Sequence, residues 1–202
     1  MRLFVALDID FAVRERIAGF MADVQRLAPE ARWVKPESFH ITLKFLGEES
    51  PERMQQIKRA LGGVRNSPTT ISFGGTGFFP NPRAARVFWV GITADAQLPL
   101  LATKVDEALR ILKIPAETQP FTPHLTLARG GERRHPRGGS GRPQWRPGDK
   151  PRDTFSRLQE SLAPQPPPDF GTITATEFFL YESKLSPSGA QYTRLASFPL
   201  SA

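Results

Sequence analysis

Two segments of the chain, about 84 residues apart, repeat one pattern of strand, helix and strand. The run FVAL at Phe4–Leu7 resembles WVGI at Trp89–Ile92, and a helical pattern follows each of them. The strand after each helix carries a similar tetrapeptide, HITL at His40–Leu43 and HLTL at His124–Leu127. The offsets are 85 and 84 residues. Such a duplication predicts two similar halves that share a cleft.

Each repeated tetrapeptide places a histidine and a threonine two residues apart. Residues two apart on a strand point to the same face, so His40 lies beside Thr42, and His124 beside Thr126. The alternative is that each histidine is merely a hydrogen-bonded strand residue. With only three His and 14 Thr in the chain, two such pairs in equivalent places argue against coincidence. The pattern favours two imidazoles and two hydroxyls that converge on one cleft.

The remaining elements are typical of an α+β protein. Strands are expected at 2–9, 33–34, 39–45, 70–73, 87–92, 124–128, 172–181 and 192–198, and helices at 12–27, 52–61, 98–112 and 155–162. With 202 residues and 39% hydrophobic content, the chain is long enough for one sizeable core. The apolar run Leu3–Leu7 stops at Asp8, too short for a membrane span or a signal-peptide core. We therefore expect a cytoplasmic protein without membrane contact, and a monomer.

A glycine-rich basic stretch interrupts the second half. Residues 130–152 hold seven Lys or Arg against two Asp or Glu, with no apolar periodicity. This composition predicts a flexible insertion at 130–152 within a single two-lobed domain that spans residues 1–202. The insertion is either an arm that attracts phosphates or a solvated linker.

The duplicated motif restricts the chemistry. Two histidines with pKa values near neutrality suit paired acid and base catalysis, and threonine hydroxyls can donate to phosphate oxygens. The chain has no Cys and no clustered carboxylates, so we expect no metal site. It also lacks a nucleophile elbow, a Walker loop and a dinucleotide fingerprint, so we expect no cofactor. The residues point to metal-free phosphodiester chemistry.

Four segments resemble the 2H phosphoesterase superfamily, and within it the RNA 2′,3′-cyclic phosphodiesterases, also known as 2′–5′ RNA ligase-like proteins. They are RLFVALDI at the start, VKPESFHITLKFLGE at Val34–Glu48, FTPHLTLAR at Phe121–Arg129, and LYESKLSPSGAQYTRLASFPL at Leu180–Leu200. The paired His-x-Thr motifs alone indicate the superfamily, and the longer segments indicate this branch. The basic stretch after Arg129 departs from the family by its length.

The resemblance implies a fold and an activity. The fold would be α+β, with two pseudo-symmetric lobes, each an antiparallel sheet with outer helices, around a central V-shaped cleft. The activity would be hydrolysis of RNA 2′,3′-cyclic phosphate ends, or of small cyclic nucleotides, to 2′-phosphates without metal. His40 and His124 would be the acid and base, in an order left open, and Thr42 and Thr126 would hold the phosphate.

Arg129 and Phe45 are the further candidates for substrate binding. Arg129 lies three residues beyond Thr126, so a regular strand would turn it to the opposite face. Arg129 needs a bulge or the strand's end to reach the phosphate, and otherwise it is a surface arginine. Phe45 could stack on the terminal base, or it could be a core residue. Phe121, Tyr181 and Lys35 are weaker candidates for the cleft rim, and Trp33 and Trp89 are expected in the core.

Two other functions remain open. A non-catalytic RNA- or nucleotide-binding module could keep the cleft, although such a module would be expected to lose a motif residue, and all four are present. Alternatively, 2′–5′ RNA ligation could be the main activity. With no nucleotide-activation motif, ligation could only reuse the energy of the cyclic phosphate, so hydrolysis should dominate in water.

Overall fold

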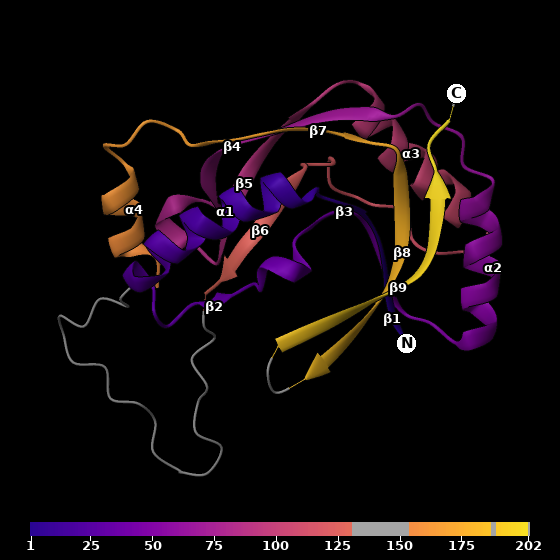
Figure 1. The fold of residues 1–202 in the computed structure, drawn as a ribbon. Coiled ribbons are helices and arrows are strands. Elements are labelled where there is room, and N and C mark those ends of the chain that lie inside the picture. Colours follow the sequence, from indigo (N-terminus) through magenta and orange to yellow (C-terminus); the bar gives the residue numbers. More distant parts are fainter. Residues whose placement is uncertain (131–153, 187–188, 202) are drawn as a thin grey trace, which may run out of the picture.

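The chain folds into two antiparallel sheets with helices packed against them, which confirms the α+β class (Figure 1). A computed structural model describes residues 1–130, 154–186 and 189–201. Sheet A has four strands in the order β3 (His40–Glu48), β1 (Arg2–Asp8), β8 (Glu177–Ser186) and β9 (Gly189–Pro199). Sheet B has five strands in the order β2 (Arg32–Trp33), β6 (His124–Arg129), β5 (Val87–Ala94), β4 (Thr69–Phe79) and β7 (Asp169–Ala175).

The two sheets follow one topology. In sheet A, β1 leads through a helix to β3, its neighbour at the edge, and in sheet B, β5 leads through a helix to β6. Beyond the central strand, β8 and β9 match β4 and β7, and only the short β2 has no counterpart. β3 contacts β6 although the two strands belong to different sheets. The duplication seen in the sequence therefore brings both His-x-Thr strands to the junction between the halves.

The helices bury one apolar stripe each. They are α1 (Phe11–Val24), α2 (Pro51–Gly62), α3 (Gln97–Arg110) and α4 (Ser156–Leu162). Asp10 caps α1 by accepting a 2.8 Å hydrogen bond from the Val13 amide. α1 packs against β7, whereas α3 contacts both β3 and β4 and so links the two sheets. Among the described residues, no helix is both long and apolar enough to cross a membrane.

One hydrophobic core runs through both halves. It includes Val5 and Ile41 of sheet A, Val90 and Leu125 of sheet B, and the inner face of α3. The single two-lobed domain over residues 1–202 stays a prediction. The basic insertion expected at 130–152 falls almost entirely on residues 131–153, which lie outside the described residues.

The segment 172–181, expected as one strand, is instead two strands in different sheets. β7 ends at Ala175 and pairs with β4, while β8 begins at Glu177 and pairs with β1. Between them, the carbonyl of Thr176 accepts a 2.7 Å hydrogen bond from the Leu200 amide. No glycine or proline marks this crossing, because the chain passes from one sheet to the other without reversing in a tight turn.

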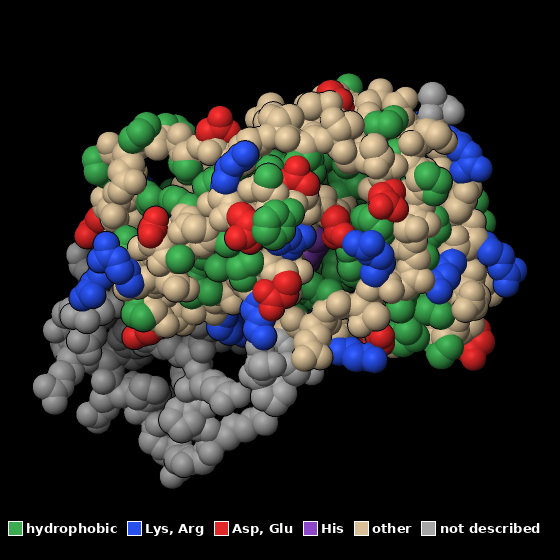
Figure 2. All heavy atoms as spheres, viewed as in Figure 1, with side chains coloured by type: hydrophobic (Ala, Val, Ile, Leu, Met, Phe, Trp, Pro, Cys, Tyr) green, Lys and Arg blue, Asp and Glu red, His purple; other side chains and the backbone are tan. Residues whose placement is uncertain are grey.

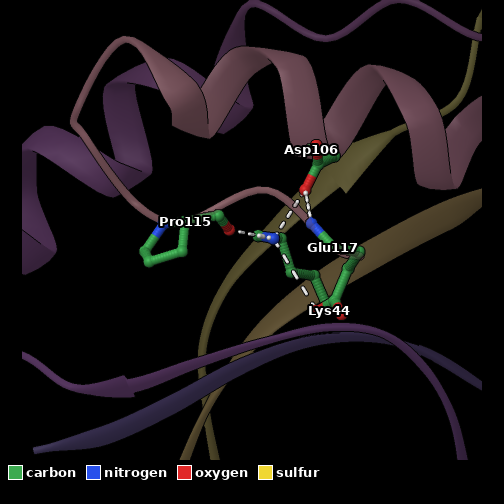
Figure 3. A network of polar contacts seen from close by, with 4 residues as sticks. All are labelled: Lys44, Asp106, Pro115 and Glu117. Atoms are coloured by element: carbon green, nitrogen blue, oxygen red, sulfur yellow. Dashed lines mark hydrogen bonds and ion pairs between the residues drawn. The ribbon is translucent and has the colours of Figure 1, made fainter. Parts of the chain in front are cut away.

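Lys44 ties β3 to α3 from inside the protein (Figure 3). Its side chain is 2% exposed, and its Nζ lies 2.5 Å from Asp106 Oδ1, 2.8 Å from the Pro115 carbonyl and 3.7 Å from Glu117 Oε1. Asp106 also accepts a 3.2 Å hydrogen bond from the Glu117 amide. A buried ammonium needs such partners because it has lost its hydration.

We expect Asp106→Ala to lower the free energy of unfolding by about 3 kcal/mol, because it leaves a buried ammonium without its closest carboxylate. Glu117→Ala is the matched control, and it should cost less than about 1 kcal/mol because Glu117 is largely exposed. Replacing both partners, Lys44→Met with Asp106→Leu, should restore most of the loss. Urea unfolding measures all three variants, and equal losses for Asp106→Ala and Glu117→Ala would contradict this account.

Candidate active site

The two motif histidines are held in the same way. His40 Nδ1 donates to the Ser38 carbonyl at 2.8 Å, and His124 Nδ1 donates to the Thr122 carbonyl at 2.9 Å. In both cases the acceptor lies two residues before the histidine. Because a carbonyl only accepts, each neutral ring carries its proton on Nδ1 and leaves Nε2 as a free acceptor.

An aromatic ring stands edge-on to each histidine. The Tyr192 ring lies 5.1 Å from the His40 ring at 88°, and the Phe79 ring lies 5.0 Å from the His124 ring at 81°. His40 also contacts Phe4, at 4.8 Å between ring centroids. These contacts, together with the Nδ1 hydrogen bonds, fix the orientation of both imidazoles.

A bulge follows the threonine in each motif strand. Val5 and Ala6 pair with Lys44 and Thr42, which leaves Leu43 as an extra residue in β3. In β6, Phe88 and Trp89 pair with Ala128 and Thr126, so Leu127 is the extra residue. Both residues of each bulge are buried: Leu43 and Lys44 in β3, Leu127 and Ala128 in β6.

The bulges return Phe45 and Arg129 to the face that carries the histidine and threonine, which we call the motif face of each sheet. An extra residue shifts the side-chain alternation by one position. Phe45 is accordingly 57% exposed, which rules out a place in the core, and it lies 6.1 Å from Phe4 on that face. Arg129 is exposed, and its charge acts on His40. Phe45 and Arg129 occupy equivalent positions in the two halves.

Burial lowers the pKa of His40, and the surrounding charges adjust it further. The hydrogen bond to the Ser38 carbonyl and the carboxylate of Asp8 raise the pKa, whereas Arg129 and His124 lower it. Arg129 and His124, both on β6 of sheet B, thus act on the pKa of His40 in sheet A. The structure brings His40, His124 and Arg129 within electrostatic reach of one another. Figure 2 shows a histidine side chain recessed in a hollow between charged side chains.

Asp8 lies directly opposite His40 in the β1–β3 register. The Tyr181 hydroxyl donates to Asp8 Oδ1 at 2.5 Å, and Arg194 forms an ion pair with the same carboxylate. Burial and the bond to Asp8 raise the pKa of Tyr181 to about 12, so its hydroxyl stays protonated and holds the carboxylate in place. The Arg194 guanidinium also stacks on Phe179, at 3.9 Å from the ring centroid.

No sequence pattern marked Asp8, Phe79 or Tyr192 as part of this site. Asp8 was visible as the polar end of an otherwise apolar strand. Tyr192 lies within the quoted segment at the C-terminal end, without a pattern of its own. Trp89, expected in the core, is half-buried on the motif face of sheet B, where it pairs with Thr126 and stacks on Phe79.

Groups of three or more metal-binding side chains do not occur in the described part of the chain. The polar groups on the motif faces are imidazoles, hydroxyls, guanidinium groups and the carboxylate of Asp8, which Tyr181 and Arg194 bind. The imidazoles, the hydroxyls and Arg129 are a set that can bind an anion and transfer protons.

Comparisons with known proteins agree with this arrangement. Residues 7–89 match the model of the LigT-like phosphoesterase family. The RNA 2′,3′-cyclic phosphodiesterase of Archaeoglobus fulgidus is 32% identical over 98% of this chain and 99% of its own length. The enzyme of that name from Thermus thermophilus is 32% identical over 99% of this chain and 90% of its own length.

Solved structures show the same fold. The TT0787 protein of Thermus thermophilus superposes with a TM-score of 0.73 at 28% identity, over 99% of this chain and 98% of that one. Escherichia coli LigT in complex with 3′-AMP gives a TM-score of 0.74 at 26% identity, over 100% and 98% of the two chains. The fold, the duplicated motif strands and the full-length relatives together show that this chain belongs to the LigT-like phosphoesterase family of enzymes.

Proposed function

We propose that the protein hydrolyses RNA 2′,3′-cyclic phosphate ends to 2′-phosphomonoesters, by a metal-independent mechanism in which two histidines act as acid and base. The observation that carries the proposal is the duplicated geometry of His40 and His124, with matching tautomers and Nε2 atoms free to exchange protons. Relatives named RNA 2′,3′-cyclic phosphodiesterase support RNA as the substrate class. The proposal extends to small cyclic nucleotides, which carry the same cyclic phosphate. LigT of Escherichia coli binds 3′-AMP and phosphate, ligands of related chemistry.

The proton transfers follow from the tautomers. One neutral imidazole accepts a proton at Nε2 from water as the water oxygen attacks phosphorus. The bond between phosphorus and O3′ breaks, and the other imidazole, protonated beforehand, donates its Nε2 proton to O3′. The product carries a 2′-phosphate and a 3′-hydroxyl. The choice of O3′ as leaving group comes from the family resemblance.

The remaining residues of the site would bind the substrate. Thr42 and Thr126 donate hydroxyl hydrogen bonds to the non-bridging phosphate oxygens, and Arg129 stabilises the negative charge that grows on them. Phe45, exposed on the motif face, offers a stacking surface for the terminal base. Phe45 and Arg129 follow equivalent bulges. Sheet A would therefore hold the terminal base through Phe45, and sheet B would hold the charged phosphate through Arg129.

End-group analysis of RNA that ends in a 2′,3′-cyclic phosphate tests the proposed reaction. In the presence of EDTA we expect complete conversion to a 2′-phosphate, as compared with 2′- and 3′-phosphate standards by chromatography. RNA of the same sequence with a linear 3′-phosphate is the control, and it should remain unchanged. A predominant 3′-phosphate would contradict the assigned leaving group, and loss of activity in EDTA would contradict metal independence.

Replacing either motif histidine by asparagine removes Nε2 while an amide donor can still reach the carbonyl bound by Nδ1. We expect His40→Asn and His124→Asn each to lower turnover at least about 100-fold, the scale of a lost acid–base catalyst. Thr42→Ala and Thr126→Ala should lower it less. His135→Asn changes the one histidine outside the motifs and is the matched control. Near-normal turnover in either folded motif variant would refute the two-histidine mechanism.

The carboxylate of Asp8 raises the pKa of His40, so Asp8→Asn should move that pKa further below its ordinary value of 6.5. Imidazole NMR during a pH titration measures the change, with Asp23→Asn on the exposed side of α1 as the control. A higher pKa in Asp8→Asn would contradict the assignment.

Because folding lowers the pKa of His40, the contribution of neutral His40 to the free energy of unfolding should be lost as the pH falls below about 6.5.

A further inference from the structure

Arg2 and Tyr192 lie at the end of the motif face of sheet A, beyond Phe4. Arg2 pairs with Ser183 on β8, and Ser183 pairs with Tyr192 on β9. Residues directly opposite one another in an antiparallel sheet share a face, so these three side chains form one row. Glu48 of β3, opposite Arg2, extends the row, and its carboxylate pairs with the N-terminal ammonium of Met1 at 3.2 Å. Arg2 also alternates with Phe4 along β1, which places it on the same face as His40.

The Tyr192 ring spans the distance from this row to the catalytic centre. It contacts Phe4 at 5.1 Å and 73°, and it contacts His40 at 5.1 Å and 88°. Burial raises the pKa of Tyr192, while the charges of Arg129 and Arg2 act in the opposite direction. The phenol is therefore under the influence of two guanidinium groups, one from each sheet.

Arg2, Arg129 and Tyr192 carry polar groups that no side chain in the described part of the chain binds. Within residues 1–130, 154–186 and 189–201, no carboxylate pairs with the guanidinium of Arg2 or Arg129, and no side chain bonds the Tyr192 hydroxyl. By contrast, Arg194 on the same face is neutralised by Asp8. Two guanidinium groups and a phenol beside them present hydrogen-bond donors and positive charge, which is a combination that binds phosphate.

We propose that Arg2 and Tyr192 form a second phosphate subsite, which binds the phosphate on the 5′ oxygen of the terminal nucleotide. The inference rests on the proposed function, in which Arg129, the threonines and the histidines hold the cyclic phosphate. Arg2 lies four positions before Ala6, the partner of Thr42, so the two rows are about 13 Å apart along β1. One nucleotide together with an extended arginine side chain spans this separation. The preferred substrate is then a nucleotide with a 5′ phosphate or phosphodiester.

Three substrates separate the 5′ phosphate from the rest of the ligand. They are adenosine 2′,3′-cyclic phosphate, the same compound with a 5′-monophosphate, and the dinucleotide that ends in the cyclic phosphate. For the wild-type protein we expect kcat/KM about tenfold higher for the second and third than for the first, as for one charge-assisted contact. Arg2→Gln should abolish this advantage, and Tyr192→Phe, which keeps the ring contacts, should reduce it. Arg110→Ala, an exposed arginine on α3, is the matched control and should retain the advantage.

Three results for the relative kcat/KM of the three substrates would contradict the proposed subsite. Equal kcat/KM for all three substrates, or an advantage that survives both Arg2→Gln and Tyr192→Phe, would overturn the subsite. An advantage confined to the dinucleotide would overturn it too, because the second nucleoside would then be recognised instead of a phosphate. A higher kcat/KM for both the 5′-monophosphate and the dinucleotide supports a site that binds the internucleotide phosphate. A higher kcat/KM for the 5′-monophosphate alone supports a site that binds a phosphate monoester.

Binding without turnover tests the subsite separately from the reaction. By titration calorimetry we expect adenosine 2′,5′-bisphosphate to bind about tenfold more tightly than adenosine 2′-phosphate, and Arg2→Gln to remove the difference. A protein that shows this difference but hydrolyses no cyclic phosphate would refute the proposed function and leave the subsite standing. Equal affinities in the wild-type protein would refute the subsite whatever the activity.

Discussion

The pairing of β1 with β3, and of β5 with β6, places one extra residue in each motif strand immediately after the threonine. That insertion turns two consecutive side chains into the core and sends the next one back to the motif face. Without it, Phe45 and Arg129 would point into the interior, and Lys44 would lie on the motif face, away from Asp106. The composition of the site therefore depends on the register of two strand pairs.

Electrostatics and burial then set the state of the site. The Nδ1 hydrogen bonds determine which nitrogen of each imidazole can work, and burial lowers the pKa of His40, which favours the neutral form. The exposed Arg129 and Arg2 have no ionic partners among the described residues, whereas the buried Lys44 and the half-buried Asp8 are neutralised within the protein. A phosphate ligand would supply the missing negative charge. The positive charge of Arg129 disfavours the protonated form of His40. The same charge favours the binding of an anion beside the two motif strands.

Much of this could be predicted from the sequence, because the motif repeats and strand alternation is regular. The strands carrying His40 and His124, the shared face of each histidine and threonine, and the α+β class all follow from local patterns. The bulges could not be located, because no residue type marks them: the extra residues are ordinary leucines. The crossing at Thr176 was missed for a similar reason, since no glycine, proline or other turn residue marks it. Asp8 and Tyr192 belong to the site through cross-strand register, which a sequence read element by element does not contain.

The central claim is that His40 and His124 act as one acid–base unit across the two sheets. The most direct measurement is the single-turnover rate of the double variant His40→Asn/His124→Asn beside the two single variants, on RNA with a 2′,3′-cyclic phosphate end. Residues that act as a unit are not additive, so the double variant should be about as slow as the slower single variant. A loss equal to the product of the two single losses would show that the histidines act independently, and it would contradict this account.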